Sequence, residues 1–249
     1  MKALLKPYFQ TYSLIIYLNK GTKKNFEYCE APTEKMRRTM YGTWGGDIKE
    51  FSPNGSQPPE RLLYREEGAA RTILFVGRLV RAKGVFDLID GFAIVASQIS
   101  DVKLLLVGNG SEKSELKRRV QQLGLEDRVR FVGTVLNRDL PRYFRGASLF
   151  VCPSITVRDW EEQIGMANIQ AMACGVPVIS KRCPIPEYVK HGETGLLVPE
   201  QQPKLLSQAM LDLLTNPELA NTLSTTGRKY AVEHYNASEN MAHIEEYFI

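Results

Sequence analysis

Short runs of apolar residues alternate with longer stretches of mixed apolar and polar positions from Arg71 to the end of the chain. The short runs are rich in leucine and β-branched side chains and predict strands, whereas the longer stretches repeat apolar residues at helical spacing. We predict one helix from a Ser111 cap to Gly124. The predicted strands cover 72–76, 102–107, 128–132, 148–152, 177–180 and 195–198. The predicted helices cover 85–98, 111–124, 137–146, 165–174, 203–215, 217–233 and 236–247.

Almost every position in the predicted strands is apolar, as expected for strands that are buried on both faces. Strands and helices alternate six times, which predicts a doubly wound, mostly parallel α/β sheet. Residues 1–70 break this pattern. We expect 1–41 to be an N-terminal stub without a full βαβ unit, and the Gly-, Pro-, Asn- and Ser-rich segment 42–70 to be a linker. The sheet domain is therefore predicted to span 71–249.

Composition and charge indicate which classes of protein this sequence fits and which it does not. Hydrophobic residues make up 43% of the 249 positions and charged residues 24%, which is typical of globular chains. A formal net charge of +4 is too small to indicate a nucleic-acid partner. Four cysteines without a CxxC pair indicate reduced thiols in a cytoplasmic protein. Neither they nor the three histidines have metal-ligand spacing, so we expect no metal site.

Glycine and polar residues follow several of the predicted strands. In an open parallel sheet, ligands bind beyond the carboxyl ends of the strands, so these residues are expected to line a cleft. The "GNG" at Gly108 is only a fragment of a dinucleotide fingerprint, and turn chemistry explains it equally well. The residues that follow the first four strands are Gly77-Arg78 and then Lys83-Gly84, Gly108 to Ser111, Gly133 to Val135, and Pro153-Ser154.

Two basic residues bracket the loop after the first predicted strand. Arg78 and Lys83 precede a helix, whose first N–H groups and positive dipole end attract anions. An arginine fork and a lysine point charge both suit phosphate oxygens. The alternative is two solvated basic residues in a surface turn.

The stretch 159–199 carries the sharpest signal for a ligand. Gly165 lets the backbone approach a ligand at the start of a helix. Glu162 lies in the preceding loop and Gln170 in the helix, where a carboxylate and an amide can bind two sets of sugar hydroxyls. The alternative is a helix-start charge and a solvated glutamine.

Taken together, these segments resemble the retaining glycosyltransferases of family 4, which have the two-domain GT-B architecture. The resemblance covers 42–249 and follows the order of the family's motifs. It implies that the sheet domain is the Rossmann-like, donor-binding half. The motifs are "VGRLVRAKGVFDLI", "LLLVGNG", "VRFVGTV", "LFVCPS", "EEQIGMANIQAMACGVPVIS" and "HGETGLLV".

The resemblance also implies roles for single residues. Arg78 and Lys83 would contact the donor diphosphate, and both, with Glu162, would be catalytic. Glu162 holds the first position of the family's Glu-x7-Glu signature and would contact the donor sugar. Gln170 holds the second position, where the family has a glutamate for the ribose hydroxyls, so donor binding is expected to be weakened. The remaining donor-binding residues would be Gly77, Gly108, Gly133, Val135, Asn137, Ile164, Gly165 and Met166.

The expected reaction is metal-independent sugar transfer with retention, from a nucleoside-diphosphate sugar, preferably a UDP-sugar, without a cofactor. The acceptor is a sugar, a lipid-linked or a small-molecule hydroxyl compound. Residues 1–41 do not supply the family's N-terminal domain, so a partner chain or a longer gene product would provide it, and homodimerisation is a further expectation. The expected location is the cytoplasm. The modestly basic N-terminal segment is compatible with a peripheral position at the inner membrane face or with a partner, although a solvated face is the favoured interpretation.

Three other functions stay open. One is a non-catalytic nucleotide-sugar sensor or regulatory subunit, which Gln170 favours. Another is a nucleotide-sugar epimerase, although acid–base groups are few and no histidine lies near the motifs. The third is a truncated product without a function of its own.

Overall fold

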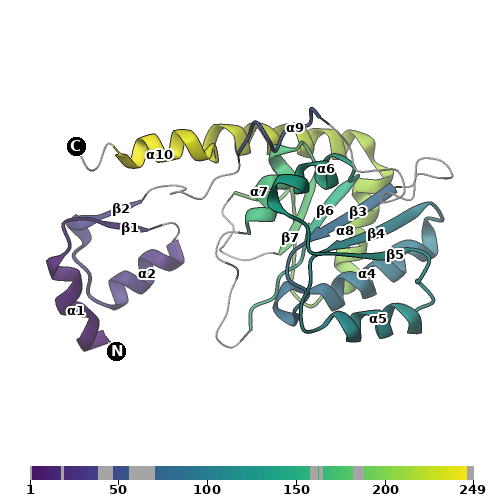
Figure 1. The fold of residues 1–249 in the computed structure, drawn as a ribbon, viewed down its shortest axis with the longest axis horizontal. Helices are drawn as coiled ribbons and strands as arrows, with labels where there is room; N and C mark the ends of the chain where they lie inside the picture. The colour runs from purple at the N-terminus through teal and green to yellow at the C-terminus, as the bar shows by residue number, and fades with distance from the viewer. Residues whose placement is uncertain are drawn as a thin grey trace.

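The computed structural model describes residues 2–17, 20–38, 47–55, 71–157, 162, 165–181 and 188–245. Its centre is a six-stranded sheet in the order β5-β4-β3-β6-β7-β8, with every neighbouring pair parallel (Figure 1). The predicted doubly wound sheet is confirmed. The strands are β3 (Arg71–Val76), β4 (Val102–Val107), β5 (Val129–Gly133), β6 (Leu149–Cys152), β7 (Val178–Lys181) and β8 (Leu196–Val198).

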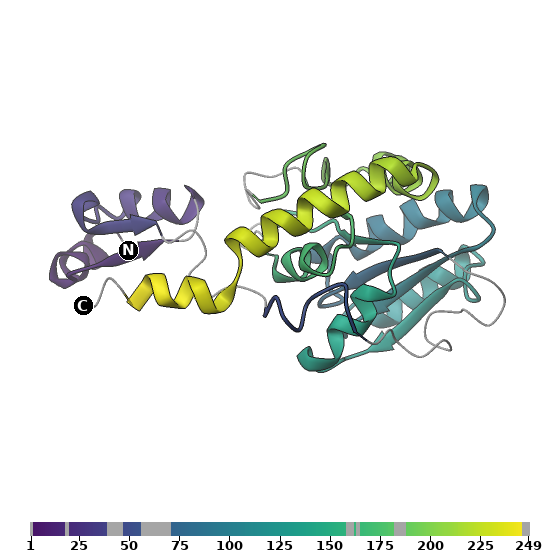
Figure 2. The same ribbon diagram turned by 90° about the horizontal axis from the view of Figure 1, so that it is seen from above.

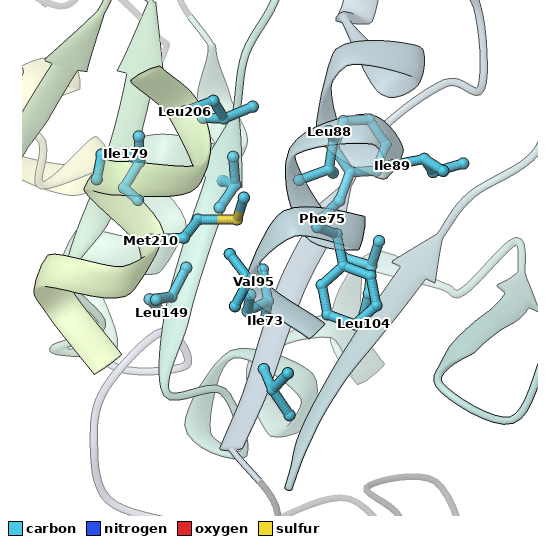
Figure 3. Packing of buried hydrophobic residues seen from close by; sticks show 14 of the residues in the cluster. Ile73, Phe75, Leu88, Ile89, Val95, Leu104, Leu149, Ile179, Leu206 and Met210 are labelled. Atoms are coloured by element: carbon cyan, nitrogen blue, oxygen red, sulfur yellow. The ribbon is translucent and has the colours of Figure 1, made fainter. Parts of the chain in front are cut away.

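Helices cover both faces of this sheet, which explains its apolar strands. Successive residues of β3 alternate between the two faces: Ile73 and Phe75 belong to one core and Leu74 to the other. Figure 3 shows the first core, where Val95 of α4 and Met210 of α8 meet the side chains of β3. The first core takes side chains from α4 (Val85–Gln98), α5 (Lys113–Gln122), α8 (Pro203–Thr215) and the first half of α9 (Pro217–His234). The second core takes them from α6 (Leu140–Arg145), α7 (Met166–Ala173) and the end of α9.

Two predictions about α5 had different outcomes. The Ser111 cap is wrong, because the chain is still in a turn there and the helix begins at Lys113 with no side-chain cap. The stop at Gly124 is confirmed. Gly124 adopts φ +65°, its N–H donates to the Gln121 carbonyl at 3.0 Å, and the Leu125 N–H donates to the Val120 carbonyl at 3.0 Å. This is the glycine-ended hydrogen-bond pattern that satisfies the last carbonyls of a helix.

The N-terminal residues form a small unit of their own. It consists of α1 (Lys2–Thr11), β1 (Ile15–Tyr17), α2 (Lys20–Tyr28), the short 3-10 helix η1 (Thr33–Lys35) and β2 (Met36–Arg38). Because β1 and β2 are parallel and α2 connects them, the expectation that 1–41 lack a βαβ unit is wrong. Its separate core is built on Ile15, Ala31 and Met36. Both views show this unit to one side of the large sheet, with α10 (Ala237–Glu245) extending toward it (Figures 1 and 2).

Part of the predicted linker packs on the sheet domain. Phe51 is 2% exposed and lies edge-on to Phe144 of α6, with ring centroids 6.0 Å apart. Arg145 Nη1 donates to the backbone carbonyls of Glu50, Ser52 and Asn54, each at 3.3 Å. Residues 47–55 are therefore anchored to the second core, while 42–46 and 56–70 of the predicted linker lie outside the described residues.

The topology places a switch point between β3 and β6. From β3 the chain continues through α4 to β4 on one side, and from β6 it continues through α7 to β7 on the other. The loops that leave two neighbouring strands in opposite directions open a crevice at the carboxyl edge, and ligands bind there in open α/β sheets. The residues after β3 and β6 therefore line the expected ligand site.

Candidate functional site

The loop after β3 packs tightly on the loop after β6. A short 3-10 helix, η2 (Arg81–Lys83), leads into Gly84, which adopts φ +65° and precedes α4. A Cβ atom at Gly84 would lie 1.9 Å from the Pro153 carbonyl oxygen. The Ile155 N–H also donates to the Ala82 carbonyl at 2.8 Å. Only glycine permits this approach, which brings Lys83 next to the residues that follow β6.

Lys83 and Glu162 form an ion pair across the switch point. Lys83 Nζ donates to Glu162 Oε2, and Ser154 Oγ donates to the same oxygen at 3.1 Å. The side chains of Lys83 and Glu162 are only 15% and 13% exposed, so their attraction is stronger than that of a surface pair. Beneath them, burial raises the pKa of the Cys152 thiol. The sequence predicted a basic and an acidic ligand contact here, and the structure joins the two.

The start of α7 lies beside this pair. Gly165, with φ +65°, precedes the helix, and Met166 is its first residue. The Tyr188 hydroxyl donates to the Gly165 carbonyl at 2.9 Å, and Asn168 Nδ2 donates to Tyr188 Oη at 3.3 Å. Burial raises the pKa of Tyr188 well above its ordinary value, so the hydroxyl keeps the proton that it donates. The fixed Gly165 leaves the amino end of α7 suited to an anion.

Gln170 is buried at the start of the second turn of α7, and the solvated alternative for it is wrong. It is 8% exposed, and its Nε2 donates to Asn137 Oδ1 at 3.2 Å. Asn137 begins the 3-10 helix η3 (Asn137–Asp139) after β5, and the nearby Val135 packs against the second core. The structure therefore joins two of the predicted donor-binding residues, one from each side of the switch point.

Glycines form the rest of the edge. The Gly77 N–H donates to the Val107 carbonyl at 3.0 Å, and the Gly108 N–H donates to the Gly133 carbonyl at 2.8 Å. A Cβ atom at Gly108 would lie 1.9 Å from the Gly77 carbonyl oxygen, so this close approach requires glycine. Gly77, Gly108 and Gly133 thus lie together across three neighbouring strand ends. Arg78 is exposed, and its guanidinium has no hydrogen bond or ion pair among the described residues.

Some of the site could not have been found from the sequence. Ser154 was expected at the cleft and Asn168 lies within a quoted motif, but no pattern in the sequence indicated that Ser154 would bond to Glu162, or that Asn168 and Tyr188 would hold Gly165. The packing of β6, β7 and α7 brings these residues together. Ile164, which the resemblance placed at the donor, lies outside the described residues. Within the described ranges, no group of three or more His, Cys, Asp and Glu side chains could hold a metal ion. No described helix is long and apolar enough to cross a bilayer.

Most of the chain is similar to a known protein family. The family model described as "Glycosyl transferases group 1" matches residues 63–230. The spore coat protein SA of Bacillus subtilis is 27% identical over 227 residues, which are 84% of this chain and 58% of that protein. A GDP-mannose-dependent α-(1-6)-phosphatidylinositol monomannoside mannosyltransferase of Mycolicibacterium smegmatis is 27% identical over 239 residues, which are 94% of this chain and 61% of that protein. The chain thus spans about three fifths of these relatives.

Solved structures share the fold. HepE of Anabaena, crystallised with UDP, has a TM-score of 0.81 at 23% identity, over 96% of this chain and 64% of that one. Sucrose-phosphate synthase of Thermosynechococcus elongatus has a TM-score of 0.75 at 27% identity, over 99% of this chain and 60% of that one. These likenesses confirm the predicted Rossmann-like domain of the GT-B fold.

Proposed function

This chain belongs to the group 1 glycosyl transferases, and on that premise we propose that its sheet domain binds a nucleoside-diphosphate sugar and serves its transfer to an acceptor hydroxyl. The observation that carries the proposal is the Lys83–Glu162 pair at the switch point, beside the amino end of α7. A cation and a helix start suit a diphosphate, and a carboxylate suits sugar hydroxyls. HepE, which shares the fold, was crystallised with UDP-glucose.

The residues have distinct parts in this proposal. Arg78 and Lys83 bind the diphosphate and stabilise the charge that grows on it as the bond to the sugar breaks, without a metal ion. Glu162 holds the sugar, and Gln170 accepts a ribose hydroxyl through its carbonyl oxygen. The acceptor oxygen attacks the anomeric carbon from the face that the diphosphate leaves, so the configuration is retained. Acceptor binding requires polypeptide beyond the sheet domain, in the same or a partner chain.

Calorimetric titration with UDP, GDP and ADP tests the donor site and identifies the base. Arg78→Ala is the cleanest variant, because the exposed guanidinium has no partner among the described residues whose loss would disturb folding. Losing one charge-assisted hydrogen bond should weaken nucleotide binding by about tenfold or more. Lys204→Ala, which removes an exposed lysine at the start of α8, is the matched control and should bind as the wild type does. A folded wild type that binds none of the three nucleotides contradicts the proposal.

A non-catalytic nucleotide-sugar-binding subunit is the second candidate. It is favoured by the Gln170 amide, which is neutral and already bonded to Asn137. Sugar release or transfer from UDP-glucose or GDP-mannose, followed by product chromatography, separates the two. Turnover that Glu162→Gln abolishes supports the enzyme. Tight nucleotide-sugar binding without turnover, even with candidate acceptors present, supports the binding subunit.

A further inference from the structure

A buried lysine at the end of β7 is not explained by the proposed donor site. Lys181 is 1% exposed, although an unpaired charge in such a place would be strongly unfavourable. Its Nζ lies 3.0 Å from Glu200 Oε1 and 3.3 Å from Thr156 Oγ1. Thr156 follows β6 and Glu200 follows β8, so Lys181 joins the carboxyl ends of three neighbouring strands.

Both carboxylate oxygens of Glu200 accept hydrogen bonds from Thr156. The Thr156 N–H donates to Oε2 at 2.8 Å, and Thr156 Oγ1 donates to Oε1 at 2.8 Å. The next residue, Gln201, adopts φ +55°, which is uncommon for a residue other than glycine. Asp87 of α4 accepts a hydrogen bond from the Gln201 backbone. The turn that carries Glu200 is therefore held from two sides, by Thr156 and by Asp87, in an uncommon backbone conformation.

The loop that Glu200 grips is the one that supports the candidate site. Residues 153–157 run from Pro153, which touches Gly84, through Ser154, which donates to Glu162. The Lys83 turn holds this loop on one side through the Ile155 N–H, and Glu200 holds it on the other through Thr156. Ser154 lies between Pro153, which contacts Gly84, and the two anchored residues Ile155 and Thr156, so the position of its hydroxyl is fixed.

We propose that Lys181, Glu200 and Thr156 form a positioning clamp that fixes the loop 153–157 and, through Ser154, the Glu162 carboxylate. The part of this inference that concerns sugar recognition rests on the proposed function. Glu200 and Lys181 are then positioning residues that touch neither nucleotide nor sugar. In this clamp, the two carboxylate oxygens of Glu200 accept hydrogen bonds from Thr156, and Lys181 neutralises the charge of that carboxylate.

The test compares two double variants that replace both Lys181 and Glu200, so that neither partner of this ion pair is left buried and unpaired. K181M/E200Q keeps an oxygen that can accept from Thr156, whereas K181M/E200M has a side chain of similar size without one. Hydrogen–deuterium exchange is followed in the peptide that contains Ile155 and Thr156. We expect exchange to be about tenfold faster in K181M/E200M than in K181M/E200Q, because the loop opens locally. Glu193→Met, an exposed carboxylate in the loop before β8, is the control and should exchange as the wild type does.

Binding provides the second readout. Titrations with UDP-glucose and GDP-mannose, and with UDP and GDP, separate contacts to the sugar from contacts to the nucleotide. K181M/E200M should bind the nucleotide sugar about fivefold more weakly than K181M/E200Q. Both double variants should bind the nucleoside diphosphate equally. A merely structural role would weaken both ligands together, and that result would overturn the assignment.

The two readouts keep the inference separate from the proposed function. A wild type that binds none of the four probes refutes the proposed function, and the exchange comparison still decides whether the clamp fixes the loop. Equal exchange in the two double variants overturns the clamp, whatever the protein binds.

Discussion

Replacing Gly84 by alanine tests whether the close contact between the two loops holds the site together. Gly84 has φ +65°, and a Cβ there would lie 1.9 Å from the Pro153 carbonyl oxygen. Gly124 is the matched control, because it also has φ +65° but a Cβ there meets nothing within 4 Å. Gly124→Ala should therefore cost only the left-handed backbone conformation, about 1 kcal/mol. Gly84→Ala adds a clash that the backbone must move to relieve, which brings its cost to about 3–4 kcal/mol.

Urea unfolding, followed by far-ultraviolet circular dichroism, measures both variants against the wild type. The difference between the two alanine variants isolates the clash, since the conformational cost is common to them. Nucleotide titration of folded Gly84→Ala should also show weaker binding, because the displaced turn moves Lys83 away from the amino end of α7, where the diphosphate is proposed to bind. A Gly84→Ala variant that is no less stable than Gly124→Ala would refute the argument that this contact sets the geometry of the site.

Three further predictions concern single side chains. Gln170→Glu should strengthen nucleotide binding in calorimetric titration by about fivefold, since a charged acceptor binds a hydroxyl more strongly than an amide does; unchanged affinity would show that residue 170 does not face the ribose. Burial alone would raise the pKa of Glu200, but hydrogen bonds from Thr156 and the Lys181 charge outweigh it and lower that pKa below its ordinary value of 4.5. The ionised carboxylate therefore adds stability above about pH 4.5, and this is lost as the pH falls through the lower folded-state pKa. The stability that wild type has over Glu200→Gln in urea unfolding should accordingly shrink with acidification, and a constant difference from pH 3 to 7 would contradict the assignment. Burial raises the pKa of Cys174 to about 12, so iodoacetamide at pH 8 should label the half-buried Cys29 before Cys174 in peptide mass mapping.

The main sheet could be predicted because its strands leave a clear pattern. Each is a short apolar run bounded by glycine or polar residues, and helices of ordinary length separate the runs. The small N-terminal unit left no such pattern, because β1 and β2 have three residues each and β2 reads Met-Arg-Arg. Strands this short offer too few positions for alternation to be distinguished from chance. Their pairing is visible only once Ile15 and Met36 are seen in one core.

The candidate site likewise contains residues that the sequence marks and residues that it does not. Gly84, Lys83, Glu162 and Gly165 could be singled out because strand ends, helix starts and glycines mark them along the chain. Lys181 could not, because a lysine after an apolar run is most often a solvated end of a strand. It is buried only because Glu200, which lies 19 residues later, returns to the same edge of the sheet. Long-range electrostatic partners of this kind are set by topology, and local sequence patterns do not contain them.

The pairing of Lys83 with Glu162 has a consequence for how the proposed reaction would use charge. While the two are bonded, Lys83 offers little attraction to an arriving diphosphate, and Arg78 with the amino end of α7 carries most of the initial binding. As the bond between sugar and diphosphate breaks, negative charge accumulates on the leaving group, and Lys83 can shift toward it from Glu162. An interaction that strengthens in the transition state lowers the barrier, whereas one that is complete on binding does not. The ion pair therefore keeps part of the lysine's attraction for the step in which charge develops. The glycine contact at Gly84 matters for the same reason, because it sets where Lys83 lies relative to Glu162.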